Sequence, residues 1–221
     1  APNEASGTDS ILVASKIEAI AEGTFSASSN ATSLVFSTAS SAAAGTVAGK
    51  MTFTSGGELV IKDTDTADGS SPTITLQSGD TDIAQDDVLG QIDFQAPDEG
   101  TGTDAILVAA GIAAVSEGDF SASANATSLE FMTGASEAAS AKVRITSAGH
   151  LVPTADDSYD LGTGSLQWRN IYTGDLHLSN MTKDIGNIVD GSKGDWTIQE
   201  GSEDLFIVNN NSGKKYKFNL T

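Results

Sequence analysis

The sequence contains no cysteine, and it holds only 4 prolines, 2 histidines and 6% aromatic residues in 221 positions. Without cysteine, the chain can form neither disulfides nor thiolate metal sites. With so few large side chains, each segment has little to bury, which favours modules that cover one another over a compact domain with its own core. The aromatic shortage also argues against a sugar-cleaving cleft.

Basic residues are scarce as well, since 11 Lys and Arg stand against 30 Asp and Glu and give a net charge of −19. The imbalance lies in residues 1–140, which hold 20 acidic residues and 3 lysines, whereas residues 141–221 hold 10 and 8. An acidic surface opposes binding to nucleic acid and to anionic lipid. No apolar run approaches the roughly 20 residues of a membrane helix, and no signal peptide is visible. We expect no nucleic acid partner and no membrane insertion.

What the chain does contain is one block of sequence twice. Residues 7–36 and 102–131 agree at 21 of 30 positions with an offset of 95. The match resumes with an offset of 92, where Lys50 begins KMTFTSGGELV and Lys142 begins KVRITSAGHLV. A period near 95 residues predicts a tandem module. Because the first copy lacks the lead-in that precedes the second, we expect residue 1 to fall inside a module and the chain to be the distal part of a longer polypeptide.

Within each copy, the periodicity is that of strands. Short β-branched and aliphatic runs bounded by Gly, Ser and Asn predict strands at residues 11–14, 16–21 and 33–36. The pairs Gly56-Gly57 and Ala148-Gly149 lie between two such runs and predict equivalent β-hairpins at residues 50–62 and 142–152, because glycine accepts positive φ at little cost.

Other stretches of the repeat region predict loops. Residues 38–49 are rich in alanine, but their glycines, serines and threonines favour a loop over a weak helix. Residues 63–71 and 79–87 are interpreted as acidic connectors.

The character of the chain changes after Val152. Residues 153–180 bring Tyr159, Trp168 and Tyr172 close together in sequence, and an antiparallel meander of three strands is predicted to follow. Its strands are predicted at residues 197–199, 204–208 and 214–220. The predicted division of the chain is a first β-module at 1–62, a second at 63–152, a Trp/Tyr-containing junction at 153–180, and a C-terminal β-meander at 181–221.

Residues 160–162 (DLG) followed by residues 166–172 (LQWRNIY) resemble a stretch found near the C-terminal end of many tailed-bacteriophage fibre proteins, after a string of β-modules. The Ala-, Ser- and Thr-rich modules are also similar to those of marine phage fibres and related virion appendages. The resemblance implies a homotrimeric, elongated, largely β fibre that serves in host attachment. It also implies a place in the virion after assembly in the host cytoplasm. The implied partners are other virion proteins and a host cell-surface glycan or protein. A recognisable self-cleaving chaperone domain is not seen after the motif.

The expected fold is therefore all-β: an elongated, repeat-containing, intertwined homotrimeric fibre with a C-terminal β cap. Winding three chains around one axis would bury the apolar strand faces against their copies and remove exposed sheet edges. The alternative for Trp168 is a core within one chain. The side chains expected to pack at the trimer contacts and the junction are Trp168, Tyr172, Tyr159, Phe25, Phe120, Phe36 and Phe131.

Residues 63–69 (DTDTADG) come near the pattern of a calcium loop but depart from it. The fifth position is Ala67, and Ile74 stands where the bidentate glutamate should be. A solvated turn is the better interpretation, and the same holds for Asp80, Asp82, Asp86 and Asp87. We expect no cofactor, with calcium as the ion that remains open.

His150 and His177 lie 27 residues apart with no second histidine at metal spacing, so we interpret both as surface or interface imidazoles. Stacking of histidines around a threefold axis stays open as a metal site. No nucleophile–base constellation, G-x-S-x-G or P-loop pattern occurs, so the chain is predicted not to be an enzyme.

Two rival functions remain open at this point. The first is a bacterial secreted adhesin or surface-layer protein with calcium-dependent folding. The second is a fibre-borne depolymerase that cleaves host polysaccharide.

Overall fold

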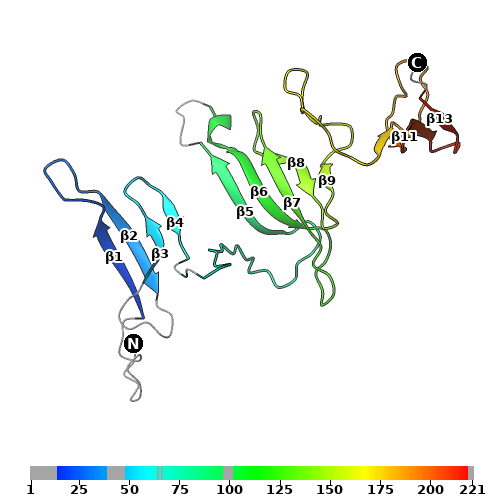
Figure 1. Cartoon of the computed structure of the whole chain (residues 1–221). Coiled ribbons are helices and arrows are strands. Elements are labelled where there is room, and N and C mark those ends of the chain that lie inside the picture. Colours follow the sequence, from blue (N-terminus) through cyan, green and yellow to red (C-terminus); the bar gives the residue numbers. More distant parts are fainter. Residues whose placement is uncertain (1–13, 39–47, 64, 66, 97–101, 219–221) are drawn as a thin grey trace. The chain divides into compact units, whose positions relative to one another are not determined.

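The computed structural model describes residues 14–38, 48–63, 65, 67–96 and 102–218. In this part of the chain the regular structure is β throughout, apart from one 3-10 turn, η2 (Asp104–Ile106) (Figure 1). The predicted all-β class is confirmed. No helix among these residues is long and apolar enough to cross a membrane. The chain divides into two compact units, Ala1–Thr75 and Leu76–Thr221.

The first unit holds one four-stranded antiparallel sheet. Its strands follow chain order: β1 (Ser15–Ala21), β2 (Thr32–Thr38), β3 (Ala48–Phe53) and β4 (Leu59–Ile61). Each strand turns directly back on its predecessor, which is the arrangement that short loops between consecutive strands produce.

The second unit begins with a five-stranded antiparallel sheet, also in chain order. Its strands are β5 (Val88–Gln95), β6 (Val108–Ser116), β7 (Thr127–Thr133), β8 (Ser140–Ile145) and β9 (Leu151–Pro153). The strands β6–β9 pair in the same way as β1–β4.

The two sheets agree in register as well as in order. Ile17 lies opposite Phe36 in the first sheet, and Ile112 lies opposite Phe131 in the second. A register shift follows each of these two phenylalanines. The same block of sequence therefore folds in the same way in both units, down to the position of a β-bulge.

A third sheet lies in the C-terminal part of the second unit, in the order β10 (Leu176–Ser179), β11 (Asp195–Glu200), β12 (Leu205–Asn209) and β13 (Lys215–Lys217). All its pairings are antiparallel. The predicted three-stranded meander is confirmed as β11–β13. β10 falls inside residues 153–180, where no strand was predicted.

Both predicted hairpins are confirmed. β3 pairs with β4 and β8 pairs with β9, and the turns contain Gly57 and Gly149 at φ of 84° and 83°. Such φ values suit glycine because other residues would clash there. The predicted strands at residues 16–21 and 33–36 are confirmed as β1 and β2.

Several predictions fall partly outside the described residues. These are the strand at 11–14 except Ala14, the loop at 38–49 between residues 39 and 47, two positions of the 63–69 turn, and the last residues of the 214–220 strand.

Each sheet has one apolar face, and that face is largely uncovered. Directly opposed residues of an antiparallel pair point to the same side. In the first sheet this rule places Ile17, Leu34, Phe53 and Leu59 on one face, and all four are exposed, Ile17 by 66%. Among the residues described, Val35 and Ala113 are the buried hydrophobic side chains. A single sheet of this kind cannot form a core by itself.

The other two sheets share this one-sidedness. The apolar face of the second sheet exposes Ile92, Phe94, Leu129, Phe131, Ile145 and Leu151. The apolar face of the third sheet exposes Leu176, Leu178, Leu205 and Tyr216.

Candidate functional site

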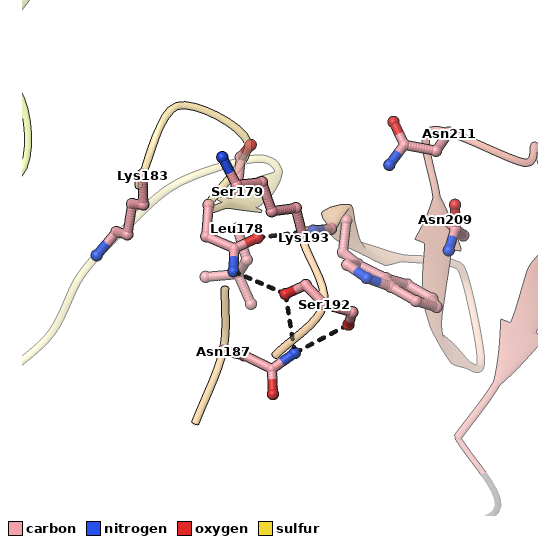
Figure 2. Close-up of a pocket in the computed structure, with 11 residues that line it drawn as sticks. Leu178, Ser179, Lys183, Asn187, Ser192, Lys193, Asn209 and Asn211 are labelled. Carbon is pink, nitrogen blue, oxygen red and sulfur yellow. Dashed lines mark hydrogen bonds between the residues drawn. The ribbon is translucent and has the colours of Figure 1, made fainter. Parts of the chain in front are cut away.

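A hollow lies beside the third sheet. It has a volume of about 500 Å³ and is lined by asparagine, serine and lysine side chains together with Trp196 (Figure 2). We call it the asparagine pocket, after Asn180, Asn187, Asn209 and Asn211. The first two lie in the loop between β10 and β11, Asn209 is the last residue of β12, and Asn211 lies in the turn between β12 and β13.

The loop between β10 and β11 is held by its own hydrogen bonds. The Asn180 Oδ1 accepts from the Gly194 N–H at 2.6 Å, and the Asn180 N–H donates to the Gly194 carbonyl at 3.1 Å. The Asn187 Nδ2 donates to the carbonyl and the hydroxyl of Ser192 at 3.1 and 3.0 Å. Asparagine is well suited to this work because its amide mimics a backbone turn. These two amides build the wall of the pocket.

Asp190 in this loop accepts hydrogen bonds from the same residues. Hydrogen bonds from the Ser192 backbone and hydroxyl, and from the Asn187 amide, hold the pKa of Asp190 below its usual range. A close approach of backbone to backbone completes the loop, because a Cβ on Gly186 would come within 1.9 Å of the Gly191 carbonyl oxygen. No residue with a side chain fits at position 186 without a shift of this backbone.

Two lysines and one indole provide the rest of the lining. Lys183 forms an ion pair of 2.5 Å with Asp157, which raises the pKa of Lys183. The Lys193 ammonium group lies 3.5 Å from the Met181 carbonyl. The Trp196 ring lies against Gly194 and 6.1 Å from the Tyr216 ring. Amides, hydroxyls, ammonium groups and an aromatic edge are suited to non-covalent recognition of a polar ligand, and no carboxylate lines the described pocket.

The three aromatic residues of the predicted junction lie on irregular backbone between β9 and β10. Tyr172 is 92% exposed and Trp168 is 65% exposed. The Trp168 ring contacts Gly162, whose φ of 92° turns the chain, and Tyr159 lies 5.9 Å from the Lys142 ammonium group. No ring contact joins these three aromatics in the part of the chain that is described. Their packing against other copies stays a prediction.

The four predicted phenylalanines occupy equivalent places in the two modules. Phe36 and Phe131 lie in β2 and β7 on the apolar faces, and Phe36 meets Phe53 edge to face at 6.2 Å. Phe25 and Phe120 lie in the loops that follow β1 and β6. Phe120 is half-buried, with its N–H bonded to the Ile83 carbonyl at 2.9 Å, whereas Phe25 is exposed. The lead-in to β5 therefore covers a residue that stays open in the first module.

Most of the aspartates considered as calcium ligands accept hydrogen bonds from nearby backbone N–H groups. Asp63 and Asp80 each accept the N–H two residues on at 2.9 Å, and Asp87 accepts the Ala84 N–H at 2.7 Å. His177 is paired with Thr197 Oγ1 at 3.0 Å. Among the residues that the structure describes, no three acidic or histidine side chains come together as a metal site.

Sequence reasoning missed a carboxylate in each module that joins the loop after β1 or β6 to the hairpin turn after β3 or β8. Glu22 accepts hydrogen bonds from the Ser33 hydroxyl at 2.5 Å and from the Ser55 N–H at 2.8 Å. Glu117 accepts the Ser147 N–H at 3.2 Å and also the Ser147 hydroxyl. The bonds from Ser33 and Ser55 hold the pKa of Glu22 below its usual range. The signal was available, because both copies of the repeat keep glutamate and serine at these positions.

No protein-family model matches the chain, and no curated protein matches it. Its structure is similar to the carboxy-terminal domain of the bacteriophage T5 L-shaped tail fibre, with a TM-score of 0.32 and 13% identity over 72% of this chain and 79% of that one. It is also similar to that domain with its intramolecular chaperone domain, with a TM-score of 0.34 and 14% identity over 80% of this chain and 60% of that one.

Proposed function

We propose that the chain is a structural, non-enzymatic fibre protein of a bacteriophage virion that assembles as a homotrimer and contributes to host attachment. The observation that carries this proposal is the set of one-sided sheets. All three expose most of their large apolar side chains on one face, with Ile20 and Val60 exposed on the other face of the first sheet, and buried hydrophobic residues are nearly absent from the described chain.

The energetics favour association. Burying one fully exposed large apolar side chain contributes about 1.5–3 kcal/mol. Ile17, Leu34, Phe53 and Leu59 of the first sheet are about half exposed, so their remaining burial represents roughly 3–6 kcal/mol per chain. A lone sheet without a covering layer is marginal in water. Copies of the same chain are the simplest cover, because one symmetry axis serves all three sheets at once.

Three copies follow from the sequence resemblance at residues 160–172 to phage fibre proteins. In such an assembly, Trp168, Tyr172 and Tyr159 pack at the junction, and Phe25, Phe36, Phe120 and Phe131 pack in the modules. The four segments predicted from the sequence then act as two shaft modules, a junction and a cap.

Attachment would be multivalent. Three copies of one weak site raise avidity without strong individual contacts. The asparagine pocket is our candidate for the site, because it combines polar donors with an indole. Its described lining includes two lysines and no carboxylate, whereas residues 1–140 carry a large excess of acidic side chains.

The native mass tests the assembly. We expect a particle of three times 22.5 kDa in light scattering of the purified chain. A stable, folded monomer would contradict the proposal. Attachment is tested separately by incubating fluorescent chain with a panel of bacterial strains, where we expect decoration of susceptible cells that excess unlabelled chain displaces.

A further inference from the structure

The asparagine pocket stands at one end of the third sheet, where a row of three residues crosses the strands. Leu178 lies opposite Trp196, and Trp196 lies opposite Asn209, so these side chains point to the same side of the sheet. Each of the three is the first or second residue from an end of its strand. The pocket therefore lies at the rim of the apolar face, beside the loop that follows β10.

The row gives the pocket an apolar floor. Leu178 is 49% exposed, and the Trp196 indole is half-buried. An aliphatic side chain next to an indole presents a flat, partly wet surface that suits a ring with both C–H and polar groups. The volume of about 500 Å³ falls within the roughly 300–1,000 Å³ that is usual for small-ligand sites.

Two hydrogen-bond donors of the lining lack an acceptor. The Trp196 indole N–H and the Asn209 side-chain NH₂ make no hydrogen bond to any described residue. The other end of the Asn209 amide is fixed, because its Oδ1 accepts the Ser212 N–H at 2.9 Å. A Cβ at position 194 would come within 2.9 Å of the indole nitrogen, so Gly194 leaves that edge of the ring uncovered. Donors of this kind require a ligand with many acceptor oxygens.

The two lysines of the lining differ in what they already bind. The Lys183 ammonium group pairs with Asp157 at 2.5 Å, and Figure 2 shows its side chain directed away from Lys193 and Ser192. The Lys193 ammonium group has a neutral partner, the Met181 carbonyl, at the long distance of 3.5 Å. No described carboxylate forms an ion pair with Lys193. The pocket therefore offers one positive charge that is not compensated.

We propose that the asparagine pocket binds a sugar that carries one negatively charged group, either the carboxylate of a uronic acid or a sulfate monoester. The sugar ring lies on Leu178 and Trp196, the indole N–H and the Asn209 amide donate to its oxygens, and Lys193 pairs with the anion. This inference rests on the proposed function, because it names the ligand class of the same attachment site.

Other ligand classes leave part of the pocket unused. A cationic ligand has no counter-ion, because no carboxylate belongs to the described lining. A neutral sugar can use the amide and the indole, but it leaves Lys193 without a strong partner. A phosphate monoester carries close to two negative charges, and Lys193 can neutralise one of them. A charge-assisted hydrogen bond is roughly twice as strong as a neutral one, so the single anion is favoured.

The indole of Trp196 provides a direct test of binding. The chain contains two tryptophans, so a proton–nitrogen correlation spectrum of the isotopically labelled full chain has two indole signals, and Trp168→Phe identifies which is which. The probes are methyl β-D-glucuronide, the sulfate monoester of methyl β-D-glucoside, and methyl β-D-glucoside itself. We expect a charged glycoside to shift the Trp196 signal with saturation near 1 mM or below, in the range of about −4 kcal/mol for a weak single site. The neutral glycoside should bind about 5-fold more weakly or worse.

Lysine variants separate a direct contact from the overall charge. Lys193→Gln should abolish the preference for the charged glycoside and leave the affinity for the neutral one unchanged. Lys214→Gln removes the same amount of charge at a residue outside the described lining, so it should keep the preference. Asn209→Asp keeps an oxygen for the Ser212 N–H, replaces the free donor by an anion, and should weaken binding of the charged glycoside by about 10-fold.

The results that would overturn the inference are specific. They are a Trp196 signal that none of the three glycosides shifts, equal affinity for the neutral and charged glycosides, or a preference that Lys214→Gln removes as fully as Lys193→Gln. A response to the glucuronide alone supports a uronic acid, and a response to the sulfate ester alone supports a sulfated sugar.

Cell attachment fails or holds separately. If the fluorescent chain decorates bacterial cells but no glycoside shifts the Trp196 signal, the ligand class is wrong while the proposed attachment stands. If a charged glycoside binds but no strain is decorated, the ligand class stands and the attachment role is contradicted.

Discussion

The sheets β1–β4 and β5–β9 contain the same block of sequence, and they differ in what lies beside its first strand. In the second sheet β5 pairs with that strand, and three of the residues opposite β5 are small: Gly111, Ala113 and Ala114. In the first sheet the corresponding residues are Lys16, Glu18 and Ala19. Lys16 and Glu18 lie on an edge with which no described residue pairs, and Gly111 and Ala113 lie where β5 runs alongside.

The comparison teaches that substitutions between the copies follow the local environment, while the register does not change. Residues that set the register, such as Phe36 with Phe131 and Gly57 with Gly149 in the hairpin turns, are kept. Residues that face an adjacent strand differ between the copies when that strand is present in one copy and not described in the other, as Lys16 and Gly111 do.

The largest effect is expected from a charge on the apolar face. Phe131→Asp and Phe36→Asp should each destabilise the assembly by at least about 3 kcal/mol, because a large buried ring is lost and a charge is desolvated. Light scattering and thermal unfolding check this prediction. Equal losses in both modules would show that both faces are covered in the same way.

The control for this pair lies on the opposite face of the sheet, at Glu130→Gln. That variant should keep the oligomeric mass and shift the unfolding midpoint little. If Phe131→Asp stayed fully assembled with an unchanged midpoint, the apolar face of the second sheet would not be an interface.

A proline in β5 should make the second sheet resemble the first. Ile92→Pro removes a ladder donor and fixes φ, and we expect a loss of roughly 3 kcal/mol with β6 amides that exchange as fast as those of β1. Hydrogen exchange with mass spectrometry measures both the loss of stability and the exchange rates of the β6 and β1 amides. Ile74→Pro is the matched control, because Ile74 is exposed on irregular backbone.

A smaller effect concerns acid. The folded-state pKa of Glu22 is depressed by its serine donors, so its contribution to stability is present above the ordinary value of 4.5 and is lost as pH falls through the folded pKa. The Ser55 amide should therefore exchange faster, relative to its intrinsic rate, as pH drops below 4.5. In Glu22→Gln that pH dependence should disappear, while Glu58→Gln should keep it.

The smallest expected effect is that of a chelator. EDTA should move the unfolding midpoint by less than about 1 °C, since a ligand that binds only the folded state would otherwise stabilise it measurably. A large drop in both modules would favour the calcium-dependent adhesin instead. New reducing ends after incubation with bacterial polysaccharide would favour the depolymerase.

Much of the fold was predictable because the signal was local. Alternating residues predicted β1 and β2, glycine at the turns predicted both hairpins, and polar turn residues separated the strands of the final meander. β10 was missed because its residues, LHLS, are few, and a strand of four residues has too short a pattern to be distinguished from a loop.

The site was harder to predict than the fold. The asparagine pocket depends on where the loop between β10 and β11 meets the turn after β12, and such meetings are set by tertiary pairing. Trp196 and Tyr216 lie 20 residues apart and come together only through the neighbouring strand β12. The junction aromatics were noticed because they stand out in composition, and their role depends on neighbours beyond a single chain.

The carboxylate of Glu22 has a mechanical consequence. It follows the last residue of β1 and reaches Ser33 at the start of β2 and Ser55 in the turn after β3. A pull on one hairpin is therefore transmitted to the other, and neither can peel away while the bond to the serine holds. Each module should yield under tension as a single step, so that force–extension curves of the chain show whole-module jumps instead of gradual unzipping.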